Sequence, residues 1–511
     1  MIPRIPKIPR CAGLLLSIII ASAGGAAEPV DVGLRRVLFV DNYLIARSTG
    51  LETRLHSPVA RETVMVFDAP WEGSGSDFQR LIRDGGVLRM YYMATKLTST
   101  DGKKIGGGAV FACVVESKDG IHWTRPDLGL FDYEGSKHNN IIWAEPHLDN
   151  FTPLLDANPD CPRDERYKAT SGGPKGLFAF KSPDGIHWSR LAEQPIITHG
   201  RFDTQNNAFW DPVRHHYWCY LRGFHDANNQ SIEDTQHGAL GVRDIRVATS
   251  PDFRHWSEPQ MLQYGTSPDD ALYTNQIEPY YRAPEILVGF PTRYADRIFS
   301  PAAMQALPDP VHRQRRMSFM PRYGTVVTDG QFMTSRDGYV FHRWDETFIR
   351  PGPERSNNWV YGDAYQSLGL IETPAEDPTA PPELSFYADE GHWKEGESLR
   401  RYTMRIDGFV SLHARREAGE FVTPRLVFSG RRLSLNFSSS AAGYIRVELQ
   451  DADGHPLPGF TLADNDELFG DTLDRTVTWR NQSDLGSLAG KVVRLRVVLS
   501  DADLFSLKFE E

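Results

Sequence analysis

The chain has 511 residues, of which 40% are hydrophobic, 24% charged and 11% aromatic; this composition is typical of a folded soluble protein and argues against a disordered, collagen-like or coiled-coil chain. Acidic residues outnumber basic ones, 67 against 56, and no block of Lys or Arg occurs, which argues against nucleic acid and anionic membranes as main partners. The 43 Gly and 34 Pro residues imply many turns and favour an all-β fold.

The amino terminus is typical of a secretory signal peptide. Basic residues and no acidic ones stand among the first ten, an apolar run fills residues 11–21, and small residues follow up to Ala27. The alternative, a membrane anchor, needs about 20 apolar residues to cross a bilayer, more than this run supplies. We therefore expect residues 1–27 to be removed and the protein to be secreted or periplasmic.

One short motif recurs along the chain. It reads Ser-x-Asp, usually followed by Gly, and closes on a Trp; it begins at Ser117, Ser182, Ser250 and, in a longer form, Ser335. The Asp-Gly pair suits a turn with positive φ, the Ser and Asp side chains can bind the amides of that turn, and the Trp can pack on a neighbouring strand. We therefore interpret these residues as structural. A unit that recurs every roughly 65–85 residues indicates a repeated supersecondary structure.

Each repeat contains several strand-like runs. In the first repeat, apolar and β-branched residues alternate in three runs between residues 77 and 116, ahead of the motif. One more strand after the Trp makes a four-stranded unit, and a fifth unit starts near Tyr361. Five such units predict a five-bladed β-propeller over residues 28–424, with residues 37–45 as an edge strand or a seal for the ring.

The pattern changes from about residue 425. Alternating runs without the motif, separated by turn-like residues, predict a β-sandwich over residues 425–511. Such a module could bind carbohydrate or pack against the propeller, and packing is the favoured role.

The repeated motif and the order of the two domains carry a family resemblance. A secreted five-bladed propeller with Ser-x-Asp-Gly-x-x-Trp motifs and a following sandwich resembles glycoside hydrolase families 32 and 43, which act on fructans and on arabinose- or xylose-containing glycans. Most of the chain also resembles a group of secreted bacterial family 32-like proteins. The segments that carry this second resemblance are 69–73, 158–162, 273–277 and 289–294.

The resemblance implies a glycosidase but does not locate its catalytic groups. Three motifs are typical of family 32: Asn-Asp-Pro-Asn-Gly, Arg-Asp-Pro and Glu-Cys. None of them is intact in this sequence. Trp210-Asp211-Pro212 is similar to the second but precedes a strand-like run, which places Asp211 at a turn between strands. The catalytic pair is therefore sought by geometry.

In a propeller the innermost strands line a central channel, and glycosidic cleavage needs two facing carboxyl groups. The expected inner strands all begin with Asp or Asn, and further acids stand close by in two of them. Glu278 precedes Pro-Tyr-Tyr, an apolar setting that could raise the pKa of its carboxyl group, so it is the predicted general acid. The candidate catalytic residues are Asp77, Asp203, Glu278 and Asp363.

Polar and aromatic residues near the strand ends are candidates for binding a sugar. The candidate substrate-binding residues are Arg80, Asn150, Asn206, Asn275, Arg293, Trp359 and Tyr361. No metal or other cofactor is required by the sequence, although a ring of Asp and Asn could hold Ca²⁺. The glycine-rich segment 101–108 is expected to form a hairpin tip over the channel.

Two alternatives to the glycosidase remain open. A sialidase would bring three arginines together in the pocket, whereas the glycosidase first named would bring carboxyl groups together. A non-catalytic sugar-binding protein would keep the aromatic pocket without a carboxyl pair. The expected partner is a carbohydrate in each case. The sequence does not determine the sugar, the linkage or the oligomeric state.

Overall fold

A computed structural model describes residues 28–97, 108–145, 149–232, 241–298 and 300–511. The predicted signal peptide and all but the last residue of the glycine-rich segment 101–108 lie outside the described residues. In the described part, no helix is long and apolar enough to cross a membrane.

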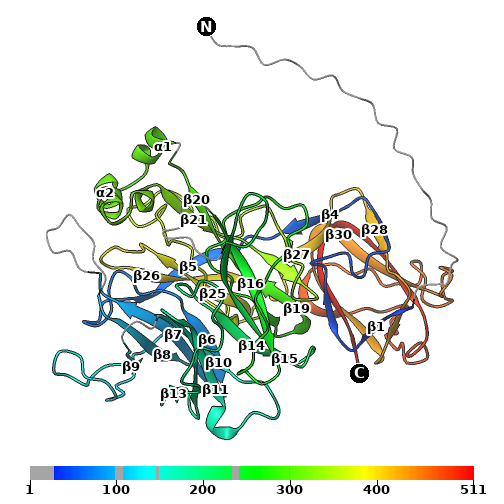
Figure 1. Ribbon diagram of the computed structural model, residues 1–511. Coiled ribbons are helices and arrows are strands. Elements are labelled where there is room, and N and C mark those ends of the chain that lie inside the picture. Colours follow the sequence, from blue (N-terminus) through cyan, green and yellow to red (C-terminus); the bar gives the residue numbers. More distant parts are fainter. Residues whose placement is uncertain (1–27, 98–107, 146–148, 233–240, 299) are drawn as a thin grey trace.

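The described residues form five four-stranded antiparallel sheets, which are the blades of the predicted propeller (Figure 1). Blade 1 holds β6 (Arg80–Asp84), β7 (Val87–Thr95), β8 (Val110–Ser117) and β9 (Ile141–Trp143). Blade 2 holds β10 (Asp149–Leu155), β11 (Tyr167–Gly173), β12 (Gly176–Ser182) and β13 (Ser189–Arg190), with the short helix η1 (Arg163–Glu165) between its first two strands. Blade 3 holds β14 (Asn207–Asp211), β15 (His216–His225), β16 (Val242–Ser250) and β17 (Gln260–Met261).

The last two blades carry an insertion and the closure of the ring. Blade 4 holds β18 (Glu278–Tyr280), β19 (Ala283–Gly289), β22 (Met333–Ser335) and β23 (His342–Arg343). Blade 5 holds β24 (Ile371–Thr373), β25 (Glu383–Glu390), β26 (Ser398–Met404) and, as its outer strand, β5 (Val59–Val66). Because β5 comes from the amino-terminal side of blade 1, its pairing with β26 joins the two ends of the propeller chain. The five-bladed fold is thus confirmed, but the seal is β5 rather than residues 37–45.

The four repeated motifs form the same turn in four blades. In the second copy, Ser182 Oγ accepts a hydrogen bond from the amide of Gly185 at 2.8 Å, and Asp184 Oδ1 accepts from the amides of Ile186 and His187 at 2.9 Å. The first three motif tryptophans are half-buried, and each packs against the cluster between its own blade and the preceding one. The motif therefore closes the turn and joins neighbouring blades, as expected.

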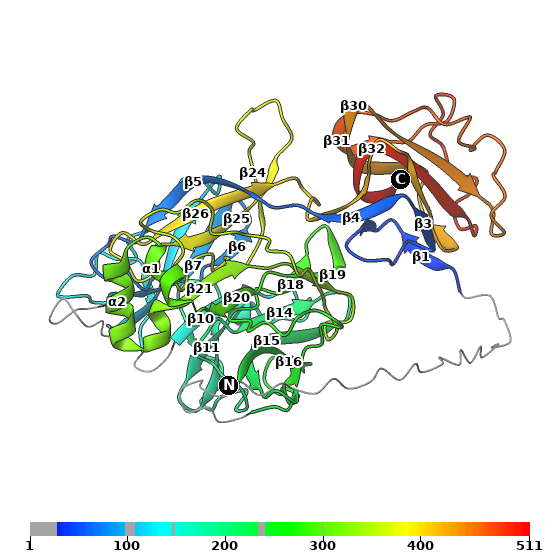
Figure 2. The same ribbon diagram turned by 90° about the horizontal axis from the view of Figure 1, so that it is seen from above.

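Blade 4 is interrupted by an insertion that the sequence pattern did not indicate. A hairpin of β20 (Thr292–Asp296) and β21 (Val326–Gly330) carries α1 (Pro301–Ala306), α2 (Pro310–Phe319) and η2 (Pro321–Gly324). Figure 2 shows the helices on the side of the propeller away from the second domain. The buried Arg316 of α2 donates to the carbonyl oxygens of Tyr361 and His392, so the insertion is held against the loops of blade 5.

The second domain combines strands from both ends of the chain. From the amino-terminal side come β1 (Val30–Gly33), β2 (Arg36–Leu38), β3 (Arg47–Thr49) and β4 (Leu51–Leu55). The rest are β27 (Val410–Ala414), β28 (Gly419–Val422), β29 (Leu426–Phe428), β30 (Arg432–Gln450), β31 (Asp471–Thr476) and β32 (Arg494–Glu510). In Figure 1 the blue amino-terminal strands lie among the orange and red ones. The predicted boundaries, 28–424 and 425–511, therefore shift, because residues 30–55 and 410–424 pair into this domain.

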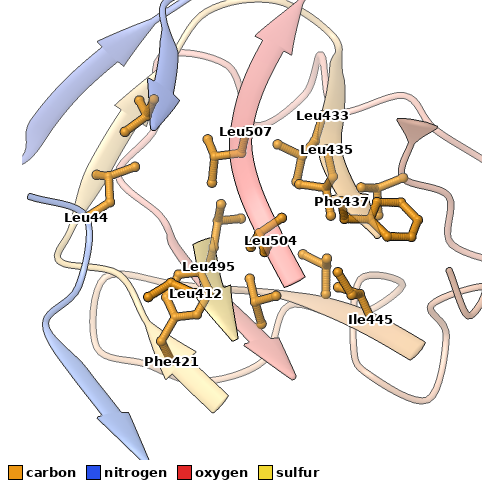
Figure 3. Packing of buried hydrophobic residues seen from close by; sticks show 14 of the residues in the cluster. Leu44, Leu412, Phe421, Leu433, Leu435, Phe437, Ile445, Leu495, Leu504 and Leu507 are labelled. Carbon is orange, nitrogen blue, oxygen red and sulfur yellow. The ribbon is translucent and has the colours of Figure 1, made fainter. Parts of the chain in front are cut away.

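One hydrophobic cluster fills the second domain. Inward residues from both halves of the long strands β30 and β32 share it, as do Leu44, Leu412 and Phe421 from elsewhere in the domain (Figure 3). A single cluster that joins both halves of two long strands is consistent with the predicted sandwich.

A buried polar group joins the two domains. The fully buried Asp407 carboxylate accepts hydrogen bonds from Tyr280 Oη at 2.7 Å and Arg282 Nε at 3.0 Å, both in blade 4. From the second domain, Ser506 Oγ donates to it at 2.9 Å, and the guanidinium of Arg36 lies 3.1 Å away. These contacts support the packing role expected for the second domain.

Candidate active site at one end of the channel

Two inner strands on opposite sides of the ring locate the channel. Arg80 begins β6 in blade 1, and its Nη1 atom donates to Glu278 Oε2 at 2.7 Å; Glu278 begins β18 in blade 4. Blades 1 and 4 are not neighbours in a ring of five, so this ion pair spans the interior of the propeller. The carboxylate predicted as the general acid is therefore engaged by a guanidinium, in a position that links two blades.

The innermost strands of four blades are entered through residues in the left-handed conformation. These residues are Phe78, Asn150, Gln276 and Ala364, with φ of 60°, 53°, 41° and 61°. Residues other than glycine adopt this conformation rarely, and it turns the chain sharply into the strand. The residues just before the four turns occupy one equivalent place around the channel; they are Asp77, Asp149, Asn275 and Asp363.

In blade 2 the start of the inner strand lies one residue earlier than we expected from the sequence. We predicted Asn150 at the start of this inner strand, but Asn150 is itself the left-handed residue, and the equivalent of Asp77 is Asp149. Asn150 is buried, and its side-chain oxygen and nitrogen make no hydrogen bond with the described residues. Asp149 was missed in the sequence, because Asn150, the next residue, was the expected start of the inner strand.

Asp363 is held by the backbone of blade 5. Its carboxylate accepts hydrogen bonds from the amides of Val360 at 3.2 Å, Gly391 at 3.0 Å and His392 at 3.4 Å. Burial raises its pKa to about 7, although these amides favour the ionised form. A carboxylate that caps two loops in the interior is structural, which argues against the catalytic role predicted for it.

Two of the three asparagines predicted to bind substrate, Asn206 and Asn275, stabilise loops in the structure. Asn275 Nδ2 donates to the carbonyl oxygens of Gln205 and Tyr220, at 3.2 and 3.3 Å, and so joins blades 3 and 4. Asn206 Nδ2 donates within its own loop, to the carbonyl oxygen of Thr204 at 2.8 Å. Both side chains are buried.

Arg293 and Trp359 also make structural contacts. Arg293 on β20 donates to both carboxylate oxygens of Asp329, at 3.0 and 2.6 Å. Side chains alternate along a strand, so its neighbour Tyr294 points to the other side of the hairpin, where it joins an aromatic cluster. The Trp359 indole donates to the carbonyl oxygen of Gly352 at 2.8 Å.

Asp77 is a buried carboxyl group beside the channel. Its side chain is 4% exposed and lies 3.6 Å from His392 Nδ1, measured from Oδ2. Its Oδ1 atom has no hydrogen-bond partner among the described residues. Burial, together with the charges of Asp389 and Asp149, raises the pKa of Asp77 well above its usual range.

Asp149 and Asp203 form a pair whose pKa values are shifted in opposite directions. Burial raises the pKa of Asp149 to about 6, and the nearby charge of Asp203 raises it further, while the amide of Asn150 and the charge of Arg222 oppose the shift. Burial also acts to raise the pKa of Asp203, but the charge and hydrogen bond of Arg222 outweigh it and the net shift is downward. The Asp203 side chain is 69% exposed, so a ligand can reach it.

An aromatic cluster stands beside these acids. The rings of Tyr323 and Tyr361 stack at 4.9 Å with an interplanar angle of 8°, and those of Tyr273 and Tyr365 stack at 5.2 Å. Tyr361 Oη donates to Tyr273 Oη at 2.9 Å. The cluster also contains Tyr294. Tyr361, which we predicted as a stacking residue, therefore lies beside the candidate acids.

Two arginines lie against the aromatic cluster, and one of them also pairs with Asp203; neither is among the substrate-binding residues predicted from the sequence. Arg222 on β15 pairs with Asp203, and its guanidinium carbon lies 4.8 Å from the Tyr273 ring centroid. Arg243 on β16 lies 4.0 Å from the Tyr294 ring centroid. β15 holds one arginine and β16 holds two, and no signal in the sequence singles out Arg222 and Arg243.

The described residues that could hold a metal ion together lie in the second domain and not at the channel. Among the described residues, one group of His, Cys, Asp or Glu has its ligand atoms within 4.8 Å of one another: Asp451, Asp453 and His455, in a surface turn of the second domain. The channel acids do not form such a group, and the sequence expectation that Ca²⁺ is not required remains a prediction.

Comparisons with known proteins returned structural similarity alone. No family model matches the chain, and no curated protein matches it. Similar solved structures include an N-acetylgalactosamine deacetylase from F. plautii in complex with blood group B trisaccharide (14% identity, 70% of this chain and 95% of that chain, TM-score 0.39). Two others are the catalytic domain of a Coprinopsis cinerea GH62 α-L-arabinofuranosidase (8%, 68% and 97%, 0.39) and a Bombyx mori GH32 β-fructofuranosidase (8%, 89% and 94%, 0.38). Any function must therefore be inferred from the site itself.

Proposed function

We propose that this protein is a secreted glycoside hydrolase that cleaves an oligo- or polysaccharide at this end of the channel, with Asp149 as the general acid and Asp203 as the ionised partner. The proposal is carried by the placement of two acids: Asp149 begins the inner strand β10 with an Oδ1 atom that has no hydrogen-bond partner among the described residues, and the exposed Asp203 is ion-paired with Arg222. The pKa values of the two groups are shifted in opposite directions. Groups whose surroundings push their pKa values apart are suited to acid and base roles in one reaction. The predicted signal peptide supports the extracellular setting.

The proposed reaction assigns one proton to each step. Asp149 donates its proton to the glycosidic oxygen as the bond to the anomeric carbon breaks. The Asp203 carboxylate either attacks that carbon or takes a proton from the water that does. In the first case water later releases the sugar and returns a proton to Asp149. Analysis of the product anomer distinguishes the two cases.

The surrounding residues have supporting roles in this scheme. Arg222 holds Asp203 in the ionised form, and we assign it a positioning role. The charge of Asp149 contributes to the raised pKa of Asp77, because two acids close together resist ionising at the same time. The tyrosine cluster offers flat apolar faces against which sugar rings can stack.

The test is turnover by the purified protein on a panel of neutral and acidic oligo- and polysaccharides, followed as new reducing ends. On any substrate that is cleaved, we expect Asp149→Asn and Asp203→Asn each to lower the rate at least about 100-fold. Asp377→Asn, at an exposed loop position, is the matched control and is expected to leave the rate unchanged. Circular dichroism establishes that each variant folds.

Two results would overturn the proposal. Cleavage that survives both substitutions would place the acid and its partner elsewhere. Saturable glycan binding with no turnover on any member of the panel would favour the non-catalytic sugar-binding protein instead.

A further inference from the structure

Three arginines converge beside the candidate acids. The guanidinium carbons of Arg201, Arg222 and Arg243 lie 5.9, 5.8 and 5.6 Å from the centroid of the Phe224 ring. Like charges gathered around one ring repel, and the repulsion is stronger where protein replaces water. Arg222 pairs with Asp203, within a protein whose formal net charge is −11.

Arg243 has no polar partner within the described part of the chain. Its residue is 8% exposed, and its guanidinium makes neither an ion pair nor a hydrogen bond with the described residues. The ring faces of Tyr294 and Tyr273, at 4.0 and 5.6 Å, attract the cation but do not accept its N–H groups in the way that oxygen does. A buried charge without a partner is costly, so the arrangement calls for a ligand.

Arg222 is only partly satisfied. One of its terminal nitrogens donates to Asp203, whereas Nε and Nη1 are buried and have no hydrogen-bond partner among the residues that the structure describes. Arg222 on β15 and Arg243 on β16 thus present unused N–H donors on adjacent strands, and Arg222 is the partner of Asp203, the carboxylate that we propose stays ionised. Guanidinium donors form a planar fork that matches the oxygens of a carboxylate or a sulfate.

Space for a ligand lies next to Arg243. This residue lines a cavity of about 310 Å³ between blades 3 and 4. Tyr264 lines the same cavity, and its hydroxyl also has no hydrogen-bond partner in the described part of the chain. Three acids share this lining, and each has another partner: Asp244 accepts from Arg246 Nε at 3.0 Å, Asp270 accepts from Arg343 Nη1 at 3.0 Å, and Asp269 Oδ1 lies 3.1 Å from His225 Nε2. None of the three forms an ion pair with Arg243 in the described part of the chain.

We propose that the glycan recognised at this site carries an anionic group, a carboxylate or a sulfate ester, bound by Arg243 together with Arg222. The inference rests on the proposed function only in assuming that a glycan is the ligand. A neutral hydroxyl would satisfy some of the N–H donors but would leave the buried charge uncompensated. Convergence of arginines is also what the sialidase alternative predicted, so a sialylated sugar belongs in the test.

The experiment compares binding of matched probes by isothermal titration calorimetry. The pairs are polygalacturonate and its methyl ester, a sulfated galactan and the same galactan after desulfation, and sialyllactose and lactose. We expect the charged member of at least one pair to bind about tenfold or more tightly than its neutral partner, with the difference shrinking towards 1 M salt. The pair that shows the difference identifies the anionic group.

Variants test whether Arg243 is responsible. Arg243→Gln is expected to abolish the difference within that pair, and Arg243→Lys to retain part of it, because lysine keeps the charge without the fork. Arg431→Gln removes one positive charge from an exposed ion pair in the second domain and is expected to change nothing. Since Arg243→Gln removes an unpaired buried charge, its melting temperature should match or exceed that of the wild type.

The outcomes separate this inference from the proposed function. Equal binding of charged and neutral partners in all three pairs, or a preference that survives Arg243→Gln, overturns the inference even if neutral glycans are cleaved. Binding of a charged probe through Arg243 without cleavage of any glycan supports the inference and overturns the proposed function.

Discussion

The pH dependence of turnover tests the roles of Asp149 and Asp203 together. With a pKa of about 6, Asp149 would be half protonated near pH 6 and about one-tenth protonated at pH 7, so the rate should fall about tenfold per unit above pH 6. With the ordinary pKa of an aspartate, 3.8, the same acid would be about 100-fold less protonated at pH 7. The lowered pKa of Asp203 keeps that group ionised, so the rate should fall at acid pH only below about pH 4. We therefore expect kcat/KM to be highest between about pH 4 and pH 6.

The assay is kcat/KM from pH 3 to pH 9 on a substrate found by the glycan panel. Asp149→Asn should remove the alkaline limb along with most of the rate. An independent readout is the pKa of Asp149 by carboxyl NMR, which should fall in Asp203→Asn, because that variant removes a neighbouring negative charge. A flat profile above pH 6, or an alkaline limb that persists in Asp149→Asn, would refute the assignment.

Three further predictions concern the fold. Trp188→Ala should cost about 3 kcal/mol in urea unfolding, because the ring is half-buried and packs 5.0 Å from Phe151 between blades 1 and 2; a loss no larger than that of exposed His187→Ala would contradict the structural role of the motif. The pKa of Asp363 is about 7 in the folded protein, against 3.8 for an ordinary aspartate, so its contribution to the free energy of unfolding is present below about pH 4 and is lost as the pH rises to 7. Asp363→Asn should therefore become more stable relative to the wild type as the pH rises across that range. A difference in melting temperature that stays constant with pH would contradict this. A chain that ends at residue 424 should aggregate on expression, because it lacks β30 and β32, which form the hydrophobic core of the second domain together with residues 30–55. A chain of residues 57–406 should be soluble. Equal solubility of the two chains would contradict the revised domain boundary.

The propeller was predictable because its signal is local and repeated. Each motif specifies a turn through hydrogen bonds within about five residues, such as those of Ser182 and Asp184, and four copies establish the period. The amino-terminal strands have no such signal. Val37 pairs with Leu507, which lies near the other end of the chain. The alternation of apolar and polar residues indicates a strand, but it does not determine which other strand pairs with it.

The insertion was missed for a related reason. Helix α2 is short, and its buried side chains include Arg313 and Arg316, whose guanidinium groups donate to carbonyl oxygens of residues 359 and 361 in blade 5 and of residue 392. A helix that buries arginines against backbone oxygens does not show the apolar stripe by which amphipathic helices are recognised. Its stability depends on blade 5, which the local sequence does not contain.

At the candidate site, the residue type predicts which chemical group is present but not how strongly that group holds its proton. Three acids occupy the same place before the inner strands of blades 1, 2 and 5, and the sequence pattern located two of them. Their surroundings differ. Asp363 accepts hydrogen bonds from three backbone amides, and Asp77 has an oxygen without a partner among the described residues. The charges of Asp203 and Arg222 shift the pKa of Asp149 in opposite directions. Neighbours from other blades supply these differences. An equivalent position therefore predicts which group is present, whereas its proton affinity depends on how the blades are packed around it.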